Sequence, residues 1–152
     1  MLRKALETEI SYLTKLSEKA FLSDVPLGSR GGGPNGWKSE EWHRKQWLEG
    51  DLYAFLLDDH LAGGCVLHEK EDSLFIHRVF LDPDFHGKGN GLLLMKEIEE
   101  SFPSVSLFTL DTPDWNSRTN QFYQKCGYRE TGRKADPVGW FQLVYYEKIL
   151  ER

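Results

Sequence analysis

The most informative segment of the chain reads Val79-Phe80-Leu81-Asp82-Pro83-Asp84-Phe85-His86-Gly87-Lys88-Gly89-Asn90-Gly91. An apolar run at residues 73–81 predicts a strand that leads into it, and a helical pattern follows over about 91–101. Closely spaced glycines before a helix allow successive backbone N–H groups to converge on one point. The helix N-terminus and Lys88 add positive charge there. We therefore expect a phosphate-binding turn between a strand and a helix.

Two common nucleotide-binding motifs do not fit this turn. Leu92 stands where a dinucleotide-binding fingerprint requires glycine or alanine. Gly89 follows Lys88 where a P-loop requires a serine or threonine that holds magnesium. A turn that only reverses the chain remains an alternative, although it would need fewer glycines.

The segments on either side predict an α/β domain with a mixed sheet of about six or seven strands. The order strand, turn, helix, strand predicts a right-handed crossover and parallel pairing between residues 73–81 and 105–110. Gly63 and Gly64 indicate a bulge or the close approach of another backbone. The other expected elements are strands at 2–5, 52–57, 60–68, 128–133 and 140–149, helices at 8–22, from the cap Ser39 to Glu49 and from the cap Ser117 to Cys126, and a glycine-rich loop at 27–36.

Length and composition indicate one domain over residues 1–152. Apolar residues make up 39% of the chain, and no apolar run approaches the roughly 18 residues of a membrane span, so we expect no membrane association. The net charge of -5 argues against a nucleic-acid partner and agrees with a cationic acceptor. Cys65 and Cys126 lack a CxxC spacing, and the N-terminus lacks an apolar signal core, so we expect reduced thiols in a cytoplasmic protein.

Two motifs in the chain resemble those of one family. The segment at 79–91 resembles the acyl-CoA-binding motif of the GNAT superfamily of N-acyltransferases, hydrophobic-x-hydrophobic-x-Pro followed by Arg/Gln-x-x-Gly-x-Gly/Ala. Asn116 and the run at 120–128 resemble its second signature, an asparagine followed by a helix with Phe-Tyr-x-Lys-x-Gly-Phe/Tyr. The expected order of elements also fits that family from about residue 2 to 149. His86 departs from the motif, because the family usually has arginine or glutamine there, and Lys88 is expected to compensate for the lost charge.

The resemblance implies a GNAT-like fold and an acyl-CoA donor. The implied sheet is mixed and mostly antiparallel, with about four flanking helices and a splayed parallel pair, 73–81 and 105–110, that holds the pantetheine arm. The implied reaction is direct transfer of an acetyl group from acetyl-CoA to a primary amine of a small molecule or peptide. The residues implied to bind acetyl-CoA are Val79, Phe80, Leu81, His86, Gly87, Lys88, Gly89, Asn90, Gly91, Asn116 and Tyr123.

Two residues are candidates for proton transfer. Tyr123 matches the family's usual proton donor to the CoA sulfur, and its alternative role is that of a half-buried core tyrosine. His77 is a candidate base because it precedes the donor-binding strand end and has an unperturbed pKa near 6.5. Strand alternation predicts that the His77 side chain shares a face with Val79 and Leu81. The alternative role of His77 is that of an ordinary structural histidine. His43, His60 and His68 have no metal-binding spacing, so no metal is expected.

The acceptor and the oligomeric state stay open at this level. We expect the acceptor site to involve residues 23–37, the helix that follows and residues 133–140. Its candidate lining residues are Arg30, Trp37, Trp42 and Trp140, each of which also fits ordinary packing. The main alternative function is a non-catalytic acyl-CoA-binding module, which the absence of a clear acidic base allows. The turn motifs argue against a third possibility, an adenine-nucleotide binder of another fold, and the protein is expected to be a monomer or homodimer.

Overall fold

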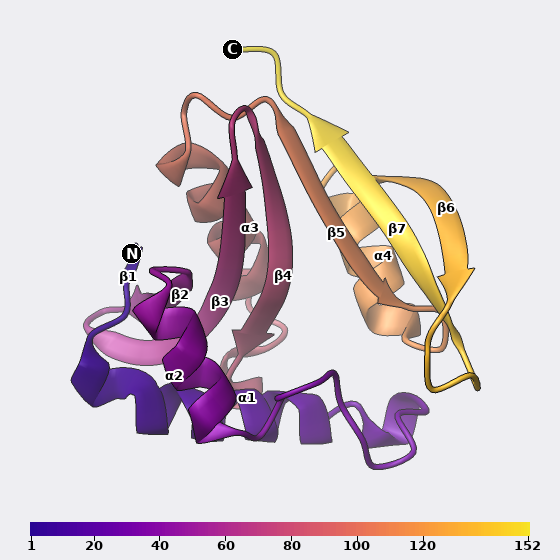
Figure 1. The fold of residues 1–152 in the computed structure, drawn as a ribbon, viewed down its shortest axis with the longest axis horizontal. Helices are drawn as coiled ribbons and strands as arrows, with labels where there is room; N and C mark the ends of the chain where they lie inside the picture. Colours follow the sequence, from indigo (N-terminus) through magenta and orange to yellow (C-terminus); the bar gives the residue numbers. More distant parts are fainter.

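The computed structural model describes all residues, 1–152, and contains a seven-stranded sheet in the order β1-β2-β3-β4-β5-β7-β6 (Figure 1). The strands are β1 (Leu2–Lys4), β2 (Leu52–Leu57), β3 (His60–Lys70), β4 (Ser73–Leu81), β5 (Leu107–Pro113), β6 (Arg129–Ala135) and β7 (Gln142–Ile149). The helices are α1 (Ile10–Leu22), α2 (Glu40–Leu48), α3 (Asn90–Ser101) and α4 (Ser117–Lys125). None of these helices is long and apolar enough to cross a lipid bilayer. Only β4 and β5 pair in parallel, so the predicted mixed, mostly antiparallel sheet is confirmed.

Helices cover both faces of the sheet. One core, on the face of α3 and α4, includes Leu94 and Ile98 of α3 together with Phe108 of β5. A smaller core, on the face of α1, includes Leu13 of that helix and Phe80 of β4. Residues of β4 therefore contribute to both cores, and this strand separates the two layers.

The parallel pair β4 and β5 separates along its length. Its three register pairs run from Ser73 with Leu107 to Phe75 with Thr109, and no pairing follows. Figure 1 shows the two strands diverging toward the end of the sheet where α1 lies. We call residues 76–81 of β4 and 110–113 of β5 the splayed segment. Along it, backbone groups on the facing edges have no strand partner, and such edges are sites where an extended ligand can add.

The backbone of β4 presents alternate residues to the splayed segment. The amide of Asp82 donates to the carbonyl of Ala62 on β3, at 2.8 Å. Because antiparallel strands alternate their hydrogen-bonding edges, the backbone groups of Val79 and Leu81 face away from β3. They therefore point toward the splayed segment, and their role in binding the donor stays a prediction.

A bulge interrupts β4 at His77. Val66 of β3 pairs with Arg78, but the next residue, Leu67, pairs with Ile76, so His77 is the extra residue. A bulge of this kind shifts the side-chain alternation by one position. Arg78 and Phe80 consequently face α1 and α2, and so does His77, which contacts Trp42 of α2. The prediction that His77 shares a face with Val79 and Leu81 was wrong, because alternation does not continue through a bulge.

Local signals explain several boundaries. The Ser39 hydroxyl accepts from the amide of Trp42 at 3.0 Å, which confirms the predicted cap of α2. The cap of α4 is Asn116 rather than Ser117, since the Asn116 Oδ1 accepts from the amide of Thr119 at 3.1 Å. Gly63 is needed for the predicted close approach, because a Cβ there would overlap the carbonyl oxygen of Phe80.

Candidate active site

The glycine turn has open space above its backbone. Gly87 and Gly89 have φ values of 74° and 79°, in the left-handed region that favours glycine. A Cβ added at either position would meet no atom within 4 Å. The first backbone bond of α3 runs from the amide of Leu93 to the carbonyl of Gly89, at 3.1 Å, so the amides of the first turn have no helical acceptor. The turn therefore fits a diphosphate that approaches the backbone closely.

Gly91 has a different role from the other two glycines. Its φ is not positive, and a Cβ there would lie 3.1 Å from ring atoms of Phe122 on α4. Its missing side chain thus allows α3 and α4 to pack closely. The side chain of Asn90 braces the turn from inside by donating to the carbonyl of Phe85, at 3.1 Å. Lys88 is exposed, and its Nζ has only a long contact, 3.5 Å, with the Asp84 carbonyl.

His86 lies between the glycine turn and β4. Its Nε2 is 3.0 Å from the carbonyl oxygen of Leu81, so the ring folds back onto the end of the strand. That carbonyl belongs to the edge that faces the splayed segment. His86, which stands where the family usually has arginine or glutamine, therefore holds the end of the strand.

Tyr123 reaches the sheet from α4. It is 9% exposed, and its ring contacts those of Phe122, Tyr128 and Tyr146. The hydroxyls of Tyr128 and Tyr146 have side-chain partners, whereas no group of the chain hydrogen-bonds the Tyr123 hydroxyl. Burial raises the pKa of the Tyr123 phenol, with smaller contributions from Cys126 and Asp111. The phenol therefore keeps its proton at neutral pH, as a proton donor must.

Asn116 is buried at 2% exposure and caps α4. Burial raises the pKa of the nearby Asp24 carboxyl, and Arg118 and Asn116 lower it. Arg118 forms an ion pair with the same carboxylate. Asn116 thus has a clear structural role, and its predicted contact with pantetheine stays a prediction.

His77 lies at the start of the splayed segment. Its Nδ1 is 2.8 Å from Nε2 of His68 on β3, and its ring packs edge-on against Trp42. Burial lowers the pKa of His77 to about 4, and the neighbouring charges of Arg78 and His68 lower it further in the same direction. The imidazole is therefore neutral at physiological pH and offers a lone pair.

Asp111 is a candidate that sequence reasoning missed. It lies on β5 just beyond the last residue paired with β4, on the face opposite Phe108 and Leu110, which belong to the α3 and α4 core. Burial raises the pKa of the Asp111 carboxyl, Arg78 of β4 lowers it, and Asp136 raises it. No ion pair or hydrogen bond within the chain occupies this carboxylate. A charged residue within the apolar run of β5 was the signal that could have revealed it.

Arg78 is buried at 7% exposure on the same face. Its guanidinium stacks over Trp42 at 4.4 Å, and its Nη2 donates to the carbonyl of Asn35 at 2.5 Å, while Nη1 is buried without a partner. Burial lowers the pKa of Arg78 to about 10, and Asp111 partly opposes that shift. The α1–α2 loop is thereby attached to β4 beside Asp111.

The four predicted acceptor-site residues fall into two groups. Trp42 lies against Arg78 and His77, and the carbonyl of nearby Trp37 accepts from the Ser17 hydroxyl. The Arg30 guanidinium instead lies 4.2 Å from the ring centre of Trp140, in the loop between β6 and β7. The α1–α2 loop therefore contacts β4 at Arg78 and the β6–β7 loop at Trp140, and Figure 1 shows it at the open end of the sheet.

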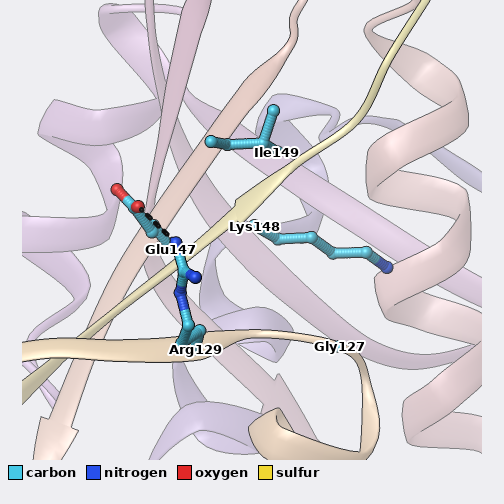
Figure 2. Close-up of a pocket in the computed structure, with 5 residues that line it drawn as sticks. All are labelled: Gly127, Arg129, Glu147, Lys148 and Ile149. Carbon is cyan, nitrogen blue, oxygen red and sulfur yellow. Dashed lines mark ion pairs between the residues drawn. The ribbon is translucent and has the colours of Figure 1, made fainter.

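One surface pocket lies away from these residues. It has a volume of about 330 Å³ and is lined by Gly127, Arg129, Glu147, Lys148 and Ile149 (Figure 2). Arg129 and Glu147 face each other across β6 and β7 at 3.7 Å, whereas Lys148 points to the other side and bonds Glu99. Its polar groups are thus already paired within the chain, and none is a predicted site residue.

Comparisons with known proteins agree with this geometry. A curated relative, YrkN of Bacillus subtilis (strain 168), is 30% identical over 80 residues, which cover 51% of this chain and 43% of YrkN, so the match spans less than half of that relative. An acetyltransferase of the GNAT family from Streptococcus agalactiae 2603 has a TM-score of 0.87 at 21% identity, covering 100% of this chain and 96% of that one. The PaiA N-acetyltransferase of Thermoplasma acidophilum, solved in complex with coenzyme A, has a TM-score of 0.72 at 18% identity, covering 99% and 98%.

The sequence profile of one family covers most of the candidate site. The profile described as Acetyltransferase (GNAT) family matches residues 23–128, which is more than half of the chain. That span contains β4, the glycine turn and Tyr123. With the mixed sheet and the splayed parallel pair, this match shows that the chain belongs to the GNAT acetyltransferase family.

Proposed function

We propose that this protein transfers an acetyl group from acetyl-CoA to a primary amine of a small molecule or peptide. The observation that carries the proposal is the continuity between two features. The edge of β4 around Val79, which has no strand partner, leads directly into the open glycine turn at Gly87 and Gly89. An extended arm that ends in a diphosphate matches both features at once.

The donor-binding residues would act in two ways. The backbone groups of Val79 and the amide of Leu81 would pair with the pantetheine arm, as an added strand does, whereas the Leu81 carbonyl is already bonded by His86. Gly87, Gly89 and the first turn of α3 would bind the diphosphate, with Lys88 adding charge. Phe80 supports this arrangement indirectly, because its side chain is buried in the α1 core and fixes the strand.

Proton transfer would use groups from both edges of the splayed segment. Asp111 on β5 would hold the acceptor as an ammonium ion, because no group of the chain pairs with its carboxylate. His77 on β4 would accept one proton and leave a neutral amine. As the new C–N bond forms and the C–S bond breaks, Tyr123 would give its proton to the departing thiolate and regain one from the acylated nitrogen.

The non-catalytic binding module is the alternative function. The free hydroxyl of Tyr123 and the unpaired carboxylate of Asp111 favour an enzyme, because a module that only holds the donor needs neither group.

The experiment that tests this proposal follows thiol release from acetyl-CoA across a panel of amines. The panel contains amino acids, polyamines, aminoglycosides and peptides with free N-termini, each with an N-acetylated form as the control. We expect amine-dependent release of CoA with at least one class. Binding of acetyl-CoA without release for any amine would support the non-catalytic module.

A further inference from the structure

A line of three polar side chains runs from the surface to the bulge of β4. Asp51 Oδ2 lies 3.2 Å from His68 Nδ1, and His68 Nε2 lies 2.8 Å from His77 Nδ1. The side chains of Asp51 and His68 are 23% and 28% exposed, so this end of the line reaches solvent. The other end, His77, lies beside Trp42 where the splayed segment begins.

The order of these groups determines where the protons lie. A carboxylate repels a ring lone pair that faces it, so the 3.2 Å contact with Asp51 favours a proton on Nδ1 of His68. With the His68 proton on Nδ1, the ring lone pair lies on Nε2, and the 2.8 Å contact then requires a proton on Nδ1 of His77. His77 Nε2 consequently has the free lone pair, and no group of the chain hydrogen-bonds it.

We propose that Asp51 and His68 are positioning residues for catalysis, which hold His77 in the tautomer with a basic Nε2 and carry the proton it accepts to solvent. This inference rests on the proposed function, in which His77 takes a proton from the acceptor amine. Asp51 precedes β2, His68 lies on β3 and His77 on β4, so only the folded sheet brings the three together.

The surroundings of His77 supply few other charges. Arg78 follows it on β4, and its positive charge disfavours a lasting imidazolium. From α2 the neighbouring ring is the uncharged Trp42, with buried His43 behind it. The acidic group on β5 is Asp111, whose interaction is with Arg78. His68 is therefore the outlet for a proton that reaches His77.

Every proton of the reaction is accounted for without another reactant. The ammonium form of the acceptor gives one proton to His77 Nε2, and His77 releases its Nδ1 proton to His68 Nε2. His68 then releases its own Nδ1 proton to solvent beside Asp51, and rotation of the rings or the reverse tautomer shift restores the starting arrangement. The second amine proton goes to the thiolate through Tyr123, so each turnover yields amide, CoA thiol and one solvent proton.

The first test measures the tautomers directly by NMR of ¹⁵N-labelled histidines in the wild-type protein at neutral pH. We expect His77 and His68 both to be protonated on Nδ1. In Asp51→Ala the Nδ1-protonated fraction of both rings should fall, whereas Asp72→Ala, at an exposed acidic residue, should leave it unchanged. A wild-type His77 with its proton on Nε2 would overturn the proposal, and this result needs no acceptor.

The second test compares kcat and KM for three variants. His77→Gln should lower kcat by about 10²-fold or more, as expected for loss of a general base. Asp51→Ala and His68→Phe should lower kcat by about 10- to 100-fold, a loss comparable to that caused by removing a group that orients a functional histidine. The KM for acetyl-CoA should be unchanged in all three variants. His60→Phe, at an exposed position on the same strand, is the matched control for His68→Phe.

The two hypotheses fail in different ways. A large loss in His77→Gln with full activity in Asp51→Ala and His68→Phe would overturn the relay and leave the proposed function intact. Wild-type protein that binds acetyl-CoA and acetylates no amine would instead contradict the proposed function. The NMR measurement then still decides the relay geometry.

Discussion

The hydroxyl of Tyr123 is the group that we expect to act on the leaving thiolate. Tyr123→Phe removes that hydroxyl and keeps the ring among Phe122, Tyr128 and Tyr146, so the fold should change little. Because thiolates leave readily without a proton, we expect kcat to fall by about 10²-fold or less, with affinity for acetyl-CoA nearly kept. Tyr12→Phe, at an exposed tyrosine of α1, is the control. Equal kcat in variant and wild type, with chemistry rate-limiting, would make Tyr123 a core tyrosine only.

The carboxylate of Asp111 should contribute to acceptor binding. Asp111→Asn keeps the shape and removes the charge, so the KM for a cationic amine should rise by about 10-fold or more, as expected for loss of a partly desolvated charge-assisted contact. The KM for acetyl-CoA should not change, and Asp72→Asn should behave as wild type. If the variant instead lowers kcat as strongly as His77→Gln and leaves the acceptor KM unchanged, Asp111 would be the base rather than the amine-binding group.

At the scale of elements, the glycine turn should bind the diphosphate through its backbone. Gly89→Val adds a β-branched side chain at a φ of 79° and fills the open space above the turn. We expect it to abolish stabilisation by acetyl-CoA while the protein still folds. Gly139→Val introduces the same strain at a φ of 85°, also with nothing within 4 Å, in the distant loop between β6 and β7. If both variants lost the stabilisation by acetyl-CoA, backbone strain would explain the loss, and a blocked glycine turn would not.

The elements also show what the sequence could and could not predict. The glycine turn and the order of strands and helices follow from local patterns of glycine and apolar spacing, and the structure confirms them. The bulge at His77 depends on the register with β3, which no local pattern encodes, so the predicted face of this residue was wrong. The length of β5 was underestimated because the polar residues Asp111 and Thr112 resemble a strand end, although both pair with β7.

For the whole molecule, half-buried His77 and buried His43 predict how stability depends on pH. The folded-state pKa of His77 is about 4, below the value near 6.5 of an unfolded chain. Between these values the unfolded chain binds a proton that the folded one does not. The contribution of His77 is therefore fully present above about pH 6.5 and is lost as pH falls toward 4. Burial lowers the pKa of His43 as well, so it acts in the same direction.

Urea unfolding at pH 7 and pH 5 tests this dependence. We expect the free energy of unfolding of the wild type to fall more between these two pH values than that of His77→Gln, because the variant has lost one of the linked groups. His60→Gln, at an exposed histidine, should retain the wild-type difference. An identical difference in wild type and His77→Gln would show that His77 is not held neutral by the fold.

Binding of acetyl-CoA tests the central claim most directly, because the splayed segment and the glycine turn are assigned to that ligand. At about 100 times its dissociation constant, a ligand that binds only the folded state stabilises it by about 2.7 kcal/mol. For a domain of this size we predict a rise in melting temperature of roughly 5–10 °C with acetyl-CoA, and none with NAD or ATP at the same concentration. A clear rise with NAD or ATP and none with acetyl-CoA would contradict the account.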